Sequence, residues 1–130
     1  MKRYTSLPEV PKPVGPYSIA VEANGFYFLS GIIPLKKSSD TNDYVIPEKF
    51  SDQLKQVFEN LKAALTSLGL DKTHVVKVTI FLTDLNTFSE LNAFYENFFE
   101  KGFPSRTTVE VSRLPKNAQI ELDCICCKHP

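Results

Sequence analysis

Few residues in this chain can carry acid–base or covalent chemistry. Its 130 residues include two histidines, His74 and His129. His74 stands where a strand is expected to start, which favours a surface or capping role, and His129 is next to the C-terminus, where we expect mobility. Neither position suggests a Ser-His-Asp or Cys-His arrangement. Gly25 and Gly31 form no phosphate-binding motif, so no nucleotide site is indicated.

Cysteine is also scarce, and its three occurrences, Cys124, Cys126 and Cys127, crowd into one segment. A disulfide framework needs partners far apart in the sequence, and a zinc site needs a second pair or histidines. We therefore expect reduced thiols in a cytoplasmic protein and no metal. Cys124 and Cys126 would share one strand face and belong to the core.

No excess or cluster of positive charge is present, because 15 Lys and Arg balance 15 Asp and Glu. Nucleic acids and anionic membranes attract clustered Lys and Arg, so neither is expected as the main partner. No apolar run is long enough to span a bilayer. The charged start "MKRYTSLPEV" has no apolar stretch after it, so no signal peptide is expected.

The chain does contain the patterns of one globular domain over residues 1–130, without internal repeats. Alternating or β-branched runs predict strands, and apolar residues spaced by three and four predict helices. The strands are expected at 17–22, 26–35, 74–85, 106–111 and 119–127, and the helices at 47–68 and from residue 86 or 87 to 99.

Local signals mark several of these boundaries. Asn24-Gly25 predicts a hairpin turn, and Gly69 predicts the end of the first helix. Proline is favoured at a first helical position, so Pro47 is expected to open that helix. Thr87 with Glu90 fits a capping box for the second helix, and Gly102 is expected to stop it. The polar tract 36–43 is expected to be a loop.

The resulting order, β-β-α-β-α-β-β, predicts an α+β fold with two layers, in which both helices cover one face of a mixed sheet. The strands carry more apolar side chains than two helices can cover. We therefore expect a second subunit on the other face. The residues behind this expectation are Leu29, Ile33, Val76, Val78, Ile80, Leu82, Val109, Val111, Ile120, Leu122 and Ile125.

Five polar residues at strand or helix positions remain as site candidates: Tyr17, Ser30, Asn92, Arg106 and Glu121. Each also has a structural explanation. Tyr17 fits a half-buried anchor of a turn, and Ser30 fits a small residue whose hydroxyl is bonded locally. Asn92 fits a water-facing helix position, and Glu121 the solvent side of an alternating strand. Arg106 opens a strand with a guanidinium that matches a carboxylate bidentately, although an ion pair with a neighbouring strand explains it too.

Several motifs together resemble the Rid family, also called the YjgF family. They are "VGPYS" (14–18), "SGIIP" (30–34), "NAFYENFF" (92–99) and "FPSRTTVEVSRLPKNAQIE" (103–121). The resemblance covers nearly the whole chain. It implies a chorismate-mutase-like fold that assembles as a homotrimer, with the sheets facing a central barrel, the helices outside and clefts between subunits.

The resemblance is greatest to the RidA-type 2-iminobutanoate/2-iminopropanoate deaminases. It implies hydrolysis of reactive enamines and imines to 2-keto acids and ammonia, without a cofactor. By this resemblance Arg106 binds the substrate carboxylate, the Thr108 carbonyl accepts from the imino group, and Glu121 activates water. Tyr17, from a neighbouring subunit, lines the cleft and relays a proton. The remaining substrate-binding positions are Ser30, Gly31 and Asn92.

Two other functions stay open. One is a carboxylate-binding or chaperone-like regulator that uses the same cleft without catalysis. The other is an RNA-cleaving translation inhibitor, against which the neutral charge and the lack of a catalytic histidine argue. The chain also departs from the family pattern: Thr108 replaces a common cysteine or alanine, Ile32 a common glutamine, and the loop at 36–45 is longer.

Overall fold

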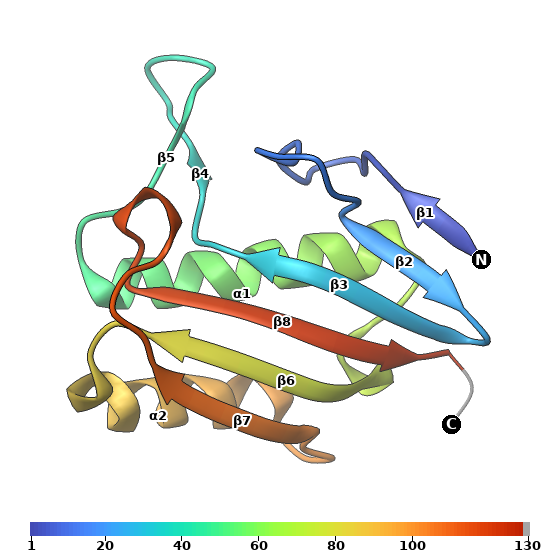
Figure 1. The fold of residues 1–130 in the computed structure, drawn as a ribbon. Coiled ribbons are helices and arrows are strands. Elements are labelled where there is room, and N and C mark those ends of the chain that lie inside the picture. The colour runs from blue at the N-terminus through green and yellow to red at the C-terminus, as the bar shows by residue number, and fades with distance from the viewer. Residues whose placement is uncertain (129–130) are drawn as a thin grey trace.

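Six strands form one mixed sheet in this computed structural model, which describes residues 1–128. The strand order is β1-β2-β3-β8-β6-β7 (Figure 1). Only β6 and β7 run parallel, and the other neighbours in the sheet are antiparallel. The strands are β1 (Lys2–Tyr4), β2 (Ala20–Ala23), β3 (Phe26–Ile32), β6 (Val75–Leu82), β7 (Ser105–Glu110) and β8 (Ile120–Cys127).

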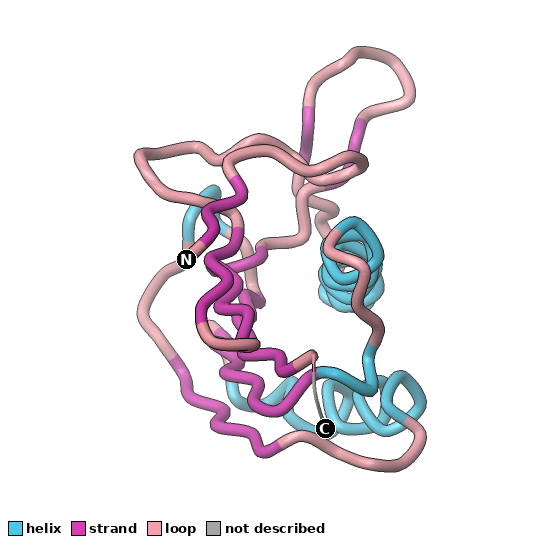
Figure 2. The backbone as a smooth tube through the Cα atoms, turned by 90° about the vertical axis from the view of Figure 1, so that its right-hand side faces the viewer, coloured by secondary structure: helices cyan, strands magenta, loops and turns pink. Residues whose placement is uncertain are grey.

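Both helices, α1 (Phe50–Ser67) and α2 (Phe88–Phe99), lie on the same face of this sheet (Figure 2). The two-layer α+β arrangement predicted from the sequence is therefore confirmed. A separate two-stranded hairpin, β4 (Lys36–Lys37) and β5 (Tyr44–Val45), projects beyond the sheet. Three short 3-10 helices complete the chain: η1 (Lys72–His74), η2 (Leu85–Thr87) and η3 (Pro115–Asn117).

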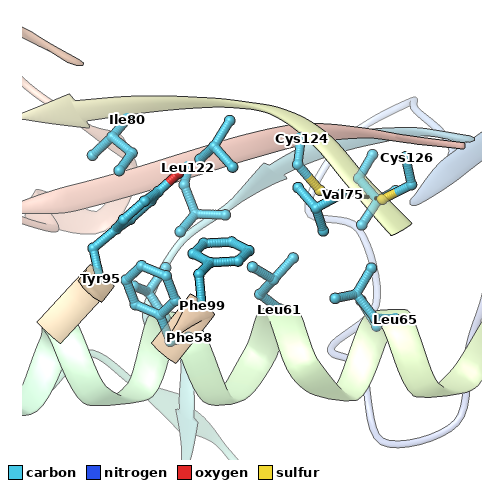
Figure 3. Packing of buried hydrophobic residues seen from close by; sticks show 14 of the residues in the cluster. Phe58, Leu61, Leu65, Val75, Ile80, Tyr95, Phe99, Leu122, Cys124 and Cys126 are labelled. Atoms are coloured by element: carbon cyan, nitrogen blue, oxygen red, sulfur yellow. Dashed lines mark hydrogen bonds between the residues drawn. The ribbon is translucent and has the colours of Figure 1, made fainter. Parts of the chain in front are cut away.

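The core lies between the helices and the sheet (Figure 3). Phe58 of α1 contacts Tyr95 of α2, with ring centroids 6.1 Å apart, and Tyr95 packs on Phe99 at 4.7 Å. Each large apolar side chain buried in this way contributes about 1.5–3 kcal/mol to folding. Cys124 and Cys126 are buried on one face of β8, with their Sγ atoms 3.9 Å apart, so both belong to the core as predicted.

The opposite sheet face keeps large apolar side chains exposed, notably Phe26, Phe28 and Val109. The rings of Phe26 and Phe28 lie 6.4 Å apart on β3. Fewer apolar strand residues are left uncovered than the sequence predicts, because six of the eleven named in the sequence analysis are buried. They are Leu29, Val78, Ile80, Leu82, Ile120 and Leu122. A second copy of the chain on the open face stays a prediction.

Several local signals are confirmed. Asn24 and Gly25 have φ values of 51° and 81°, which a tight hairpin turn between two strands requires. Gly69, with φ 74°, follows the last residues of α1. His74 is a capping residue, since its Nδ1 accepts a hydrogen bond from the Asp71 N–H at 3.0 Å. His129 lies outside the described residues.

Other boundaries differ from the prediction. Helix α1 begins at Phe50 rather than Pro47, because the first intrahelical bonds, from the N–H groups of Asp52 and Gln53, go to the Lys49 carbonyl. The expected capping box at Thr87 is absent. Its hydroxyl donates instead to the Asp84 carbonyl at 2.6 Å.

Helix α2 ends at the predicted residue, but Gly102 is not the residue that terminates it, and three short strands also differ from the prediction. Helix α2 ends at Phe99, before Gly102. The residue directly after the helix, Glu100, takes a φ of 65°. Strand β1 was not predicted, and β4 with β5 forms a hairpin where a loop was expected. No helix within residues 1–128 is long and apolar enough to cross a membrane.

Gln53 is a polar side chain in the core, only 2% exposed, and it joins two loops to α1. Its Nε2 donates to the Pro47 carbonyl at 2.8 Å, and its Oε1 accepts from the Gln119 N–H at 2.8 Å. Because Gln119 directly precedes β8, this residue fixes where β8 starts relative to α1.

We expect Gln53→Ala to lower the free energy of unfolding by about 1–3 kcal/mol, because two backbone groups lose their partner. Urea unfolding at one fixed protein concentration measures the change. Gln56→Ala is the matched control. Its side chain bonds only to Asn60, one turn along the same helix, and its loss should cost about 0.5 kcal/mol or less. Equal losses in both variants would contradict this role of Gln53.

Candidate functional site

Arg106 lies on the edge strand β7, on the face that carries the helices. It pairs in register with Val78, which is fully buried beneath the helices. Directly paired residues share a sheet face, so the Arg106 side chain points toward α2. Its Nη2 donates to Asn92 Oδ1 at 2.7 Å. No carboxylate forms an ion pair with Arg106 within residues 1–128, so the structural ion pair considered from the sequence is absent.

Two aromatic rings of α2 also contact this guanidinium. Arg106 Cζ lies 4.7 Å from the Tyr95 ring centroid and 5.4 Å from that of Phe88. Such contacts stabilise the charged form of a partly desolvated cation. The site therefore holds an arginine whose charge has no anionic partner within residues 1–128.

Thr108 lies two residues further along β7, on the same face. Its hydroxyl and that of Tyr95 are buried side-chain atoms without a hydrogen-bond partner among the described residues. Burial raises the pKa of Tyr95 to about 12, although the nearby Arg106 charge acts in the opposite direction. Tyr95 is thus a neutral phenol at physiological pH.

Glu121, Gly31 and Ser30 form a second group, where β3 and β8 meet. The pairing of these strands shifts between Leu29 and Ile32, which marks a β-bulge at Ser30 and Gly31. Gly31 lies directly beside the Glu121 carboxylate, and a Cβ at position 31 would overlap one of its oxygens. The Ser30 hydroxyl donates to the Ser18 carbonyl at 2.7 Å. A bulge of this kind commonly re-aims side chains next to a functional site.

A small apolar cavity of about 70 Å³ adjoins this second group. The exposed side chain of Tyr17 lines it together with Ser30 and Gly31. Behind them the wall is mostly apolar, with Ile19 and Ile33 among its residues. The structure therefore brings Tyr17, Ser30, Gly31 and Glu121 into one region.

The Glu121 carboxyl has a raised pKa. Burial is the main cause, and the nearby charge of Asp123 adds to it. The Asp123 carboxyl also has a raised pKa, chiefly through burial. Glu121 and Asp123 alternate with buried residues of β8, so both carboxyls lie on the open face of the sheet.

Arg106 and Glu121, one from each group, lie on opposite faces of the sheet. Arg106 pairs with Val78, whereas Glu121 pairs with Phe81, three residues further along β6. Residues three apart on a strand point to opposite faces. In the strand order, β8 and β6 also separate β3 from β7. One chain therefore brings Arg106, Thr108 and Asn92 together, and separately Tyr17, Ser30, Gly31 and Glu121.

Comparison with known proteins identifies the family. The sequence pattern of the family described as "Endoribonuclease L-PSP" matches residues 8–128. The 2-iminobutanoate/2-iminopropanoate deaminase of Dermatophagoides farinae is 40% identical over 124 residues, which cover 95% of this chain and 94% of that protein. The chain belongs to the Rid family, also called the YjgF or L-PSP family.

Solved structures agree with this membership of the Rid family. The YjgF gene product of E. coli is similar with a TM-score of 0.85 and 34% identity, covering 98% of this chain and 100% of that one. E. coli TdcF, solved with bound serine, gives the same TM-score and identity and covers 98% and 99%. The six-stranded sheet with two helices is therefore the fold of known Rid proteins.

The described residues contain no group of three or more His, Cys, Asp or Glu side chains placed to hold a metal ion. The polar side chains of both groups are carboxylate, hydroxyl, amide and guanidinium groups. Such groups can bind a small anionic substrate and exchange protons with it.

Sequence reasoning missed the environment of Arg106. The sequence pattern offers Phe88 and Tyr95 only as apolar-face residues of the second helix, and Asn92 as a water-facing residue. Their spacing of four and three was the available signal, since it places all three on one helix face. Asp123, which raises the pKa of Glu121, was missed as well. It is two residues along the same strand and therefore on the same face.

We expect Asp123→Asn to lower the pKa of Glu121, because a neighbouring negative charge disfavours ionisation. The pKa should stay above the ordinary glutamate value, since the effect of burial remains. A carboxyl-carbon NMR titration of Glu121 measures the change. Asp52→Asn, on the first turn of α1, is the matched control and should leave the titration unchanged. An unaltered Glu121 titration in Asp123→Asn would exclude the charge coupling.

Proposed function

We propose that this protein hydrolyses the reactive enamine and imine intermediates 2-aminoacrylate/2-iminopropanoate and 2-iminobutanoate to 2-keto acids and ammonia. The observation that carries the proposal is Arg106, a guanidinium held by Asn92 and two rings but without a carboxylate partner in the described part of the chain. Such substrates offer one fixed charged group, their carboxylate, and a guanidinium binds it bidentately.

The reaction needs little from the protein beyond positioning, because imines of 2-keto acids hydrolyse readily in water. With the carboxylate on Arg106, the Thr108 carbonyl accepts a hydrogen bond from the imino N–H. A water molecule adds to the C=N carbon and gives a proton to Glu121, and Tyr17 relays this proton to the nitrogen, so that a carbinolamine forms. Glu121 then takes the proton of the carbinolamine hydroxyl, which reaches the nitrogen in the same way, and the C–N bond breaks to release ammonia and the 2-keto acid. No redox step or bound cofactor is required.

Glu121 suits the role of general base because burial and Asp123 raise its pKa above the ordinary value. Gly31 lets the substrate approach this carboxylate, because no side chain stands beside it. Tyr17 lines the cleft and relays a proton, and Ser30 borders the same cavity. Asn92 holds Arg106 in place from α2.

The two groups of residues require a second copy of the chain. In the proposed homotrimer each cleft takes Arg106, Thr108 and Asn92 from one subunit and Tyr17, Ser30, Gly31 and Glu121 from its neighbour. The exposed apolar side chains Phe26, Phe28 and Val109 on the open sheet face support this assembly. A monomer would contain both halves of the site but no complete cleft.

The relatives support the same substrate class. The Dermatophagoides farinae protein is named a 2-iminobutanoate/2-iminopropanoate deaminase. TdcF was solved with bound serine, which carries a nitrogen next to a carboxylate, as a 2-imino acid does.

We expect Arg106→Ala to reduce imine hydrolysis by 100-fold or more, about the effect of losing a charged group that positions the substrate. Coupling the protein to a threonine dehydratase and following 2-ketobutyrate measures the rate. Arg113→Ala is the matched control, since it removes an exposed arginine beyond the end of β7. Identical rates for wild type and Arg106→Ala would exclude the catalytic reading. Binding of 2-ketobutyrate without rate acceleration would instead favour a non-enzymatic regulator.

Mixed oligomers test the two-subunit cleft. Arg106→Ala and Glu121→Gln are each expected to be inactive. A site is intact only when the subunit that supplies Arg106 carries Glu121→Gln and the subunit that supplies Glu121 carries Arg106→Ala. Random co-assembly should therefore restore about one quarter of the wild-type sites. Mixing Arg106→Ala with Asn92→Ala is the control and should restore nothing, since both substitutions damage the same half. Mass spectrometry shows whether mixed oligomers have formed. If they have and no activity is recovered, the shared cleft is contradicted.

A further inference from the structure

Three side chains from one face of α2 contact the Arg106 guanidinium. Phe88, Asn92 and Tyr95 follow one another at spacings of four and three, so they lie together on that face. Asn92 accepts one guanidinium hydrogen bond at 2.7 Å, and the two ring centroids lie 5.4 Å and 4.7 Å from Cζ. Each contact restrains a different property of the side chain: the amide fixes one N–H, and the rings restrict the position of the cation.

We propose that Phe88 is a positioning residue for Arg106. Together with Tyr95 and Asn92, its ring holds the guanidinium before the ligand arrives, and the donors that Asn92 does not use remain available for a carboxylate. The proposal rests on the proposed function only for the class of ligand. Neither the sequence patterns nor the named relatives assign a role to Phe88.

The physical reason is the entropy of the arginine side chain. An unrestrained arginine loses about 2 kcal/mol of rotamer freedom when it is fixed, and this loss weakens binding if it occurs on ligand arrival. When ring contacts and the Asn92 bond fix the side chain during folding, ligand binding no longer carries that cost. The contacts should therefore act on affinity rather than on the chemical step.

Phe88 is the part of this arrangement that can be changed cleanly. It is the first residue of α2 and is 38% exposed, so its ring contributes little to the core. Tyr95 is 5% exposed and packs against Phe58 and Phe99, so removal of its ring would disturb folding.

The test compares Phe88→Leu with Phe103→Leu. Phe103 is 54% exposed and makes none of the ring or cation contacts observed within residues 1–128, so it controls for the loss of a surface phenylalanine. Calorimetry with 2-ketobutyrate gives the dissociation constant, and the coupled dehydratase assay gives KM and kcat. We expect Phe88→Leu to raise the dissociation constant and KM about threefold to tenfold, with kcat unchanged. Phe103→Leu should stay within about twofold of wild type.

A second readout shows whether Phe88 acts through Arg106. In ligand-free wild type the NMR signals of the Arg106 side chain should carry a ring-current shift, and Phe88→Leu should move them toward unstructured values. Unchanged Arg106 signals would overturn the proposal. If affinity still falls, Phe88 contacts the ligand directly. Shifted signals with unchanged affinity would overturn it as well.

Failure of the proposed function remains distinguishable from failure of this inference. A protein that binds 2-ketobutyrate but hydrolyses no imine would refute the deaminase reading. The affinity and NMR comparisons of Phe88→Leu would still decide the positioning role. Circular dichroism of each variant confirms that the fold is retained.

Discussion

The alternation of side chains across a β-strand is the constraint on which the rest of this structure depends. Because β6 pairs with both β7 and β8, its register decides which of their residues share a face. Arg106 falls on the helix side and Glu121 on the open side. A single chain therefore presents the proposed carboxylate-binding group and the proposed water-activating group on different faces of its sheet. The proposal that a neighbouring subunit completes the site rests on strand register as much as on exposed apolar surface.

Each half of the candidate site is prepared separately by the fold. On the helix side, an amide and two rings hold a cation that has no counter-ion among the residues that the structure describes. On the open side, burial and a second carboxylate make Glu121 a better proton acceptor, while a β-bulge brings backbone without a side chain next to it. Under the proposed function, a substrate and a second subunit join the two halves.

Short-range features were predictable from the sequence, and features that depend on how elements pack were not. Asn24-Gly25 and Gly69 need positive φ values whatever surrounds them, so their turns were read correctly. The predicted start of α1 at Pro47 was wrong. The Pro47 carbonyl accepts a hydrogen bond from the Gln53 side chain, and the sequence pattern does not reveal that this contact holds Pro47 outside the helix. The Thr87 hydroxyl donates a hydrogen bond to the Asp84 carbonyl, and the spacing between Thr87 and Glu90 does not predict this bond. The roles of Asn92 and Phe88 depend on how α2 is rotated against β7, and only the packed structure fixes that rotation.

The contact between Gly31 and Glu121 narrows the substitutions that the chain can tolerate. Every other amino acid begins with a Cβ atom, and at position 31 that atom meets a carboxylate oxygen rather than empty space. Even alanine, the smallest alternative, would oblige the Glu121 carboxylate to swing away from position 31.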